Sequence, residues 1–342
     1  MYESFFGLCE RPFDLTPNPR YLVLTSGHAE ALSNLEYGIS SRKGITLLSG
    51  EAGSGKTTVI RTALSRQPSR VHCVYLHNPA LTRREFVEML ATQFGLSANA
   101  KVSKTALLIE LEELLRARST SGEITVLVVD EAQSLPLDLL EEIRLLANIE
   151  TNDEKLLSVI MAGQPELGVR LNDQALRQLK QRVALRCDLR PLTLQETAAY
   201  VAGRIRIAGG VGAHVFSREA VVLIHERSSG IPRTISVIAD NALLTAFAIG
   251  LRPVNGPTVR EVCRDFDLDR EDAAGSTSQS ASGQPSDEPV VNDGRVLAAA
   301  PSPPALAGRG ALPVATSAEP AARDGRLRRW WEFLSSSDRT VS

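Results

Sequence analysis

The sequence lacks paired cysteines, a strong charge of either sign and long hydrophobic runs. Its cysteines lie far apart, with no C-x-x-C pair and no histidine–cysteine cluster: Cys9, Cys73, Cys187 and Cys263. This spacing predicts neither a zinc site nor a disulfide framework, and it is typical of thiols in a reducing cytoplasm. No apolar stretch reaches the length that crosses a bilayer, and the first residues lack the basic and apolar regions of a secretory signal.

The charge balance is close to neutral. The 342 residues include 38 lysines and arginines against 40 aspartates and glutamates, which gives a formal net charge of -2. Such a chain has no overall basic field, so bulk nucleic-acid binding is not expected, although a local basic patch is compatible with this balance. The hydrophobic content of 43% and the length predict a soluble protein with two domains and a tail.

The clearest motif that is present is the glycine-rich stretch 50–57, which reads GEAGSGKT. It fits the phosphate-binding loop G-x-x-x-x-G-K-[ST] at every fixed position. The apolar residues 45–49 before it predict a short buried strand, and residues 58–64 after it predict a helix. Glycines let backbone N–H groups approach a polyphosphate closely, and a helix N-terminus favours its negative charge.

This loop predicts an ATP site with Mg²⁺. We expect Lys56 to reach the β- and γ-phosphates and the Thr57 hydroxyl to hold the metal ion. No Asn-Lys-x-Asp base-reading motif occurs, which disfavours GTP. The expected nucleotide-binding residues are Gly50, Glu51, Ala52, Gly53, Ser54, Gly55, Lys56, Thr57 and Thr58.

A second motif is the apolar run 124–129, which ends in the adjacent carboxylates of Asp130 and Glu131. A continuous apolar strand is typical of a parallel sheet that is buried on both faces. We expect Asp130 to coordinate Mg²⁺ through water and Glu131 to polarise the water that attacks the γ-phosphate. The run 156–162 predicts a further buried strand, after which Gln164 either orients water or contacts the γ-phosphate, or is a plain turn residue.

Arginines gather in the stretch 176–186. Arginine stabilises transition-state charge on a phosphoryl group and is often supplied by a neighbouring subunit. Arg182 is the preferred candidate for this role, with Arg177 and Arg186 as rivals, and a solvated basic helix face is the alternative for each of them.

From Thr193 onward only helical patterns occur, until the composition changes near residue 267. Arg233 lies at the start of one of these helices, where the dipole disfavours a cation, so we expect an anionic partner, either a bound phosphate or a local carboxylate. Near the end of the chain, Trp330 and Trp331 stand beside three arginines. That composition suits a membrane interface or a partner groove, and a solvated tail is the alternative.

Taken together, these residues resemble the AAA+ ATPase family of general secretion pathway protein A, and within it the secretion ATPases of exosortase (PEP-CTERM) loci. The resemblance covers about residues 1–268. It rests on the residues 1–8, 12–13 and 16–21, on His28, Glu30, Ala31 and Leu32, on the phosphate loop, and on the stretches DEAQ at 130–133, GQPEL at 163–167 and GIPR at 230–233.

The resemblance implies an α/β fold of the P-loop NTPase class, AAA+ type. A parallel sheet flanked by helices on both faces is followed by a small all-helical lid and a disordered C-terminal tail. It implies that Gln164 is a first sensor, Arg233 a second sensor on the lid and Arg182 the arginine that acts in trans. The expected parts are an N-terminal linker or adenine-side segment 1–44, the AAA+ core 45–192, the helical lid 193–268, a disordered linker 269–325 and a basic-aromatic segment 326–342.

The resemblance also implies a function. We expect a Mg²⁺-dependent ATP-hydrolysing protein that acts as assembly or regulatory ATPase of an envelope secretion or polysaccharide-export system. We expect a homo-oligomer in the cytoplasm, peripheral at the inner face of the cytoplasmic membrane, with surface contact through Trp330 and Trp331. Family members of full-length architecture carry a membrane helix and a peptidoglycan-binding domain, neither of which is recognisable here.

Two alternatives belong to other classes. One is a DNA-linked AAA+ ATPase of the transposition-regulator type, although nucleic acid is the less expected partner at this net charge. The other is a nucleotide-gated scaffold that barely turns over, which the intact pair of Asp130 and Glu131 disfavours.

Overall fold

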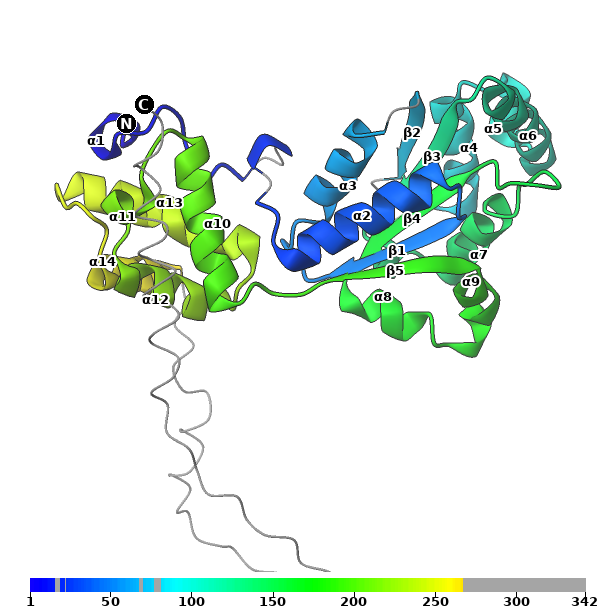
Figure 1. Cartoon of the computed structure of the whole chain (residues 1–342). Coiled ribbons are helices and arrows are strands. Elements are labelled where there is room, and N and C mark those ends of the chain that lie inside the picture. Colours follow the sequence, from blue (N-terminus) through cyan, green and yellow to red (C-terminus); the bar gives the residue numbers. More distant parts are fainter. Residues whose placement is uncertain (16–18, 22, 68–69, 77–80, 267–342) are drawn as a thin grey trace, which may run out of the picture. The chain divides into compact units, whose positions relative to one another are not determined.

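A five-stranded parallel sheet carries the candidate site (Figure 1). Its order is β2-β3-β4-β1-β5, and every neighbouring pair is parallel. The carboxyl ends of all strands therefore share one edge, where ligands of such sheets bind. The strands are β1 Ile45–Gly50, β2 Val71–Leu76, β3 Ile124–Val129, β4 Ser158–Gly163 and β5 Val183–Leu189.

The computed structural model describes residues 1–15, 19–21, 23–67, 70–76 and 81–266. The expectations for the linker 269–325 and for the segment 326–342, including Trp330 and Trp331, lie outside these residues. Among the helices described, none combines the length and the apolar character that crossing a bilayer requires.

Helices cover both faces of the sheet, as predicted, because the strands alternate their side chains between two apolar clusters. Leu127 and Val129 of β3 belong to one cluster, and Val126 and Val128 belong to the other. The first cluster is covered by α4 Arg83–Phe94, α5 Ala98–Val102, α6 Lys104–Thr120, α7 Leu137–Leu146, α8 Pro165–Arg170, η3 Gln174–Leu176 and α9 Arg177–Arg182. The second is covered by α2 Ser26–Ser40 and α3 Lys56–Ser65.

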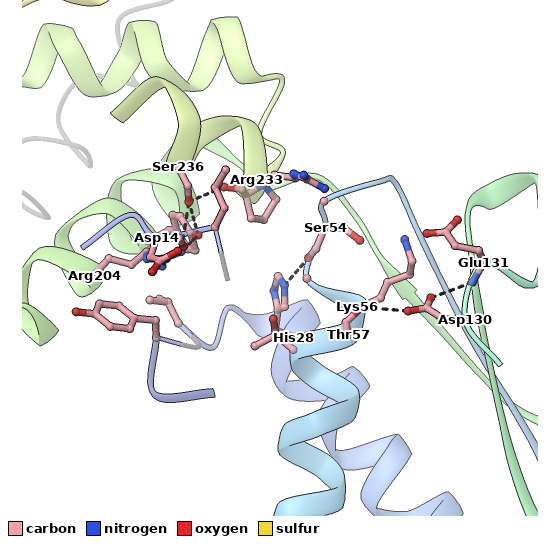
Figure 2. A pocket seen from close by; sticks show the side chains of 18 residues that line it. Asp14, His28, Ser54, Lys56, Thr57, Asp130, Glu131, Arg204, Arg233 and Ser236 are labelled. Carbon is pink, nitrogen blue, oxygen red and sulfur yellow. Dashed lines mark hydrogen bonds between the residues drawn. The ribbon is translucent and has the colours of Figure 1, made fainter. Parts of the chain in front are cut away.

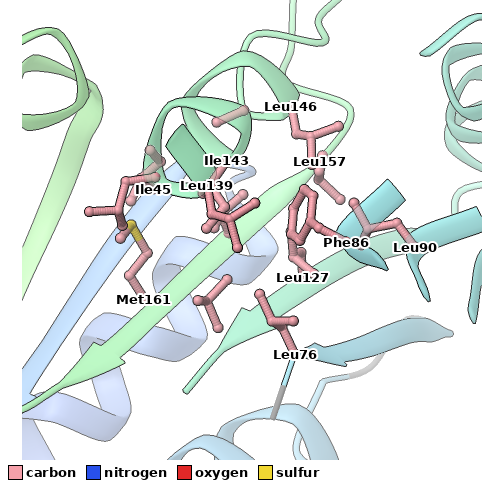
Figure 3. Close-up of a cluster of buried hydrophobic side chains, with 14 of the residues drawn as sticks. Ile45, Leu76, Phe86, Leu90, Leu127, Leu139, Ile143, Leu146, Leu157 and Met161 are labelled. Carbon is pink, nitrogen blue, oxygen red and sulfur yellow. The ribbon is translucent and has the colours of Figure 1, made fainter. Parts of the chain in front are cut away.

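The larger cluster fixes the strand that carries the two carboxylates (Figure 3). Phe86 of α4 and Ile143 of α7 pack with Leu127 of β3, and all three side chains are at most 1% exposed. Burying side chains of this size contributes roughly 1.5–3 kcal/mol each. The buried side chains therefore fix the strand 124–129 in place, and with it the position of Asp130, the residue that follows the strand.

The remaining helices follow β5. They are α10 Leu194–Ile207, α11 Gly212–Val215, α12 Arg218–Ser228, α13 Pro232–Ala248 and α14 Gly256–Asp265. A capping box begins α10: the Thr193 hydroxyl accepts from the Glu196 N–H at 3.2 Å, and the Glu196 carboxylate accepts from the Thr193 N–H at 3.0 Å. Helix α13 begins at Pro232, which suits the first helical turn.

The N-terminal segment packs in two different places. Its first residues, with α1 Glu3–Phe6, lie against the later helices: the rings of Phe5 and Phe247 are 5.6 Å apart, and the Cys9 N–H donates to the Ala208 carbonyl at 2.8 Å. Helix α2, by contrast, packs on strand β5 of the sheet and on helix α3. Between them lies η1 Pro19–Tyr21. The N-terminal segment therefore joins helices α10 to α14, called here the helical part (residues 194–265), to the sheet.

The arginine-rich stretch does not form one structure. It divides into α9, which ends at Arg182, and the edge strand β5, which contains Arg186. No strand is expected here from the sequence, in which the charged Arg186 and Asp188, both exposed in the structure, alternate with the buried Cys187 and Leu189. Burial on one face only is typical of an edge strand. The strand predicted at 156–162 begins two residues later, at Ser158.

Candidate functional site

The phosphate loop lies between β1 and α3, at the carboxyl edge of the sheet. Two of its glycines adopt the left-handed conformation, Gly53 with φ 80° and Gly55 with φ 99°. A Cβ atom on Gly53 would lie 2.5 Å from the Cβ of Arg233. Glycine is therefore required at position 53 both by its backbone and by the close approach of α13.

Lys56, the first residue of α3, is 5% exposed. Its Nζ donates to the carbonyl oxygens of Gly50 at 2.8 Å and Glu51 at 3.0 Å. Burial lowers the pKa of this ammonium, and the carboxylates of Glu131 and Asp130 act against that shift. The lysine thus lies along the loop with its charge beside the cavity.

Thr57 and Asp130 meet across the cavity floor (Figure 2). The Thr57 hydroxyl donates to Asp130 Oδ2 at 3.2 Å, and Asp130 Oδ1 accepts from the Glu131 N–H at 3.0 Å. A hydroxyl and one carboxylate, next to a place for phosphates and water, are the oxygen donors that Mg²⁺ prefers. The donor set therefore fits Mg²⁺.

Glu131 has a left-handed backbone, with φ 51° and ψ 37°. Its carboxylate accepts from Gln133 Nε2 at 2.6 Å, and Gln133 Oε1 accepts from the Gln164 N–H at 3.1 Å. Gln133 lies in η2 Ala132–Ser134. Gln164 itself is the N-cap of α8 and contributes this backbone N–H to the network.

Arg233 enters the site from α13. Its backbone N–H donates to the Gly53 carbonyl at 3.1 Å, and the residue lines the cavity. Its place at a helix start predicts a phosphate or a local carboxylate as its partner. Across the described ranges, no carboxylate forms an ion pair with Arg233.

These groups surround one cavity of about 410 Å³. Of the predicted residues, those lining it are Gly53, Ser54, Gly55, Lys56, Thr57, Thr58, Asp130, Glu131 and Arg233. Gly50, Glu51, Ala52, Gln164 and Arg182 are described but do not line it. The volume is within the range of small-molecule sites, and one end is rich in phosphate-binding groups.

Sequence reasoning missed Arg204 at the other end of the cavity. This buried arginine of α10 donates to the Pro12 carbonyl at 2.6 Å and to the Asp14 carbonyl at 3.1 Å. Its guanidinium also lies over the rings of Tyr21 and Tyr200, at 5.0 and 5.4 Å from their centroids. Its place on the apolar face of α10, four residues after Tyr200, is the one signal in the sequence that marks it.

His28 is a second residue whose part in the site was not predicted. On α2, it donates through Nε2 to the Ser54 carbonyl at 3.0 Å, while Nδ1 accepts from the Thr25 hydroxyl at 2.7 Å. Burial lowers the pKa of this imidazole, which favours the neutral form that these two bonds require. His28 thus ties α2 to the phosphate loop.

Comparison with known proteins agrees with this geometry. The family described as AAA domain matches residues 39–171. General secretion pathway protein A of Aeromonas hydrophila is 43% identical over 250 residues, which are 73% of this chain and 46% of that protein. The chain therefore spans about half the length of this relative.

Solved structures give the same fold. The ORC2 protein of Aeropyrum pernix, in ADPNP–ADP complexes, matches with a TM-score of 0.57 and 18% identity over 75% of this chain and 71% of that one. Drosophila ORC bound to DNA matches with a TM-score of 0.56 and 20% identity over 75% of this chain and 64% of that one. A Walker-type ATPase of Pyrococcus abyssi matches with a TM-score of 0.52 and 19% identity over 75% of this chain and 76% of that one. At these identities the likeness shows the fold, which confirms the predicted P-loop class.

Proposed function

Since this chain belongs to the AAA ATPases related to General secretion pathway protein A, we propose that it hydrolyses ATP with Mg²⁺ in the service of an envelope secretion or export system. The observation that carries the proposal is the convergence of Lys56, Thr57, Asp130 and Glu131 on one cavity. Each of these side chains has the chemistry that phosphoryl transfer to water requires.

In this proposal the loop holds the nucleotide. Lys56 exchanges its carbonyl partners for the β- and γ-phosphates, and the N-terminus of α3 favours their charge. Thr57 and Asp130 hold Mg²⁺, which when bound neutralises charge that develops on the phosphates. Glu131 accepts a proton from the attacking water, since its carboxylate lines the same cavity.

The two arginines and Gln164 have supporting roles in the proposal. Arg233 senses the γ-phosphate from α13, whose N-terminus is already bonded to Gly53. Arg182, exposed at the end of α9, acts on the nucleotide of a neighbouring copy in a homo-oligomer. Gln164, whose backbone N–H bonds Gln133, is the first sensor and orients the attacking water or contacts the γ-phosphate.

The envelope role rests on the relative. General secretion pathway protein A is named for secretion, and it shares 43% of the aligned residues with this chain. We propose secretion or polysaccharide-export machinery, of the exosortase-locus kind, as the partner, with the protein on the cytoplasmic side of the membrane. The DNA-linked alternative has only a fold likeness to support it.

Hydrolysis tests the enzymatic part. We expect Glu131→Gln to lower kcat about 100-fold or more while ATP still binds, because the variant keeps the side-chain shape and loses the base. Glu113→Gln, at an exposed position of α6, is the matched control and should keep the parental rate. An unchanged rate in Glu131→Gln contradicts the role of that carboxylate, and a rate that survives EDTA contradicts the role of Mg²⁺.

Partner capture tests the cellular part. The Glu131→Gln form, held with ATP, should retain its partner in a pull-down from the native cell, because hydrolysis no longer releases it. Recovery of envelope secretion or export components supports the proposal. Recovery of DNA or a transposase instead means that the ATPase activity is correctly assigned and that the proposed role in envelope secretion is wrong.

A further inference from the structure

The loop after β3 contains a glutamine that the proposed chemistry does not use. Gln133 makes two hydrogen bonds in opposite directions, through Nε2 to Glu131 Oε2 at 2.6 Å and through Oε1 from the Gln164 N–H at 3.1 Å. The orientation of the amide follows from its chemistry, since only its oxygen accepts from an N–H and only its nitrogen donates to a carboxylate. Gln133 therefore links the segments that follow β3 and β4.

The surroundings of Gln133 leave this amide little freedom. A Cβ atom on Gly163 would lie 2.8 Å from Gln133 Oε1, so the glycine leaves the room that the amide oxygen occupies. Arg170 of α8 donates to the carbonyl oxygen of Gln133 and, at 2.9 Å, to that of Leu135. The backbone of the loop is thus fixed from α8, and the side chain is fixed from the end of β4.

Glu131 depends on such support. Its left-handed backbone, with φ 51°, is disfavoured for a residue with a Cβ atom. Asp130 Oδ1 accepts the Glu131 N–H at 3.0 Å, and the Gln133 amide bonds its side chain. A strained residue at a candidate catalytic position, held from both sides, indicates a carboxylate whose direction matters.

We infer that Gln133 is a positioning residue for hydrolysis, holding the Glu131 carboxylate at the cavity through a link to the end of β4. The inference rests on the proposed role of Glu131. The amide occupies Oε2 and leaves Oε1 for water. Because the same amide bonds the Gln164 N–H, a displacement at the end of β4 is passed on to Glu131.

The test uses the full chain and two measurements, steady-state ATP hydrolysis and equilibrium binding of a fluorescent ATP analogue. Gln133→Met keeps the length of the side chain and removes both bonds. We expect kcat to fall about 10- to 100-fold with KM and analogue affinity within about twofold, since a misdirected base costs rate without costing binding. Gln174→Met, at an exposed position, should change neither.

A double variant separates positioning from a general structural effect. Added to Glu131→Gln, the Gln133→Met change should lower kcat no further, because the group that it positions is already gone. Gln133→Glu should also lose rate, since a second carboxylate cannot donate to Glu131. Gly163→Ala, whose Cβ atom would lie 2.8 Å from the Gln133 amide oxygen and equally close to Leu167 Cδ2, tests the same link should Gln133→Met not fold.

Parental kcat in Gln133→Met, or in Gly163→Ala as its substitute, overturns this role. A loss that multiplies in full with that of Glu131→Gln overturns it too, because Gln133 then acts elsewhere. A parent chain without ATP hydrolysis removes the proposed function together with this role, whereas an active parent and an active Gln133→Met variant remove this role alone.

Discussion

Gly230 is the position where a single methyl group should do the most damage to the helical part. It precedes α13 and has φ 72°. Its carbonyl accepts from the Leu192 N–H at 2.8 Å, at the connection between β5 and α10. A Cβ atom here would lie 2.2 Å from the Leu192 carbonyl oxygen and 2.9 Å from its nitrogen, both backbone atoms that no side-chain rotation can move.

The cost of Gly230→Ala has two parts. An alanine in the left-handed region costs about 1–2 kcal/mol. The contact with Leu192 must be relieved by a backbone shift, and overpacking of this kind costs about 1–3 kcal/mol more. Gly250→Ala separates the two parts, because Gly250 has nearly the same φ, 68°, and nothing within 4 Å of the added Cβ. We expect about 2–5 kcal/mol of destabilisation for Gly230→Ala against about 1–2 kcal/mol for Gly250→Ala.

Urea denaturation followed by circular dichroism measures the difference, and binding of a fluorescent ATP analogue measures its consequence. Because Arg233 of α13 is bonded to Gly53 of the phosphate loop, displacement at Gly230 should weaken nucleotide binding. Gly250→Ala should leave binding at the parental level. Equal destabilisation in the two variants would refute the reasoning, since the backbone contact would then contribute nothing.

Two further predictions concern the residues that the sequence analysis missed. Arg204→Lys should weaken binding of the ATP analogue about 10-fold or more, because an ammonium cannot reproduce the planar donor set that holds the carbonyl oxygens of Pro12 and Asp14. Arg206→Lys, on the exposed side of α10, should not weaken it. Similar effects from the two variants would exclude a part for Arg204 in nucleotide binding. Burial lowers the pKa of His28, so the stability it contributes is fully present above the ordinary histidine pKa of about 6.5 and is lost as pH falls toward the lowered value. Between pH 7.5 and about 5, the denaturation midpoint should therefore drop less in His28→Gln than in the parent. Part of the drop should remain in the variant, because burial also lowers the pKa of His225. An identical pH dependence in the two proteins would contradict this prediction.

The sequence by itself determined the phosphate loop, the carboxylates after β3 and the helices that cover both faces of the sheet. These features come from contiguous residues: a fixed motif at 50–57, an apolar run at 124–129 and helical spacing of apolar side chains. Their chemistry and their periodicity are local, so they can be read before any tertiary contact is known. The roles of all the site residues stay predictions, and Gln164 and Arg182 do not line the cavity.

Tertiary structure alone decided which distant residues complete the site. His28 reaches Ser54 across 26 positions, Arg204 reaches Pro12 across 192, and Gln133 reaches the Gln164 N–H across 31. The edge strand β5 forms because it pairs with β1, and this pairing could not be predicted from the sequence of the strand itself. A polar side chain has no pattern of its own that names its partner, because its hydrogen bonds are chosen by whichever backbone and side-chain groups the packed core brings within reach.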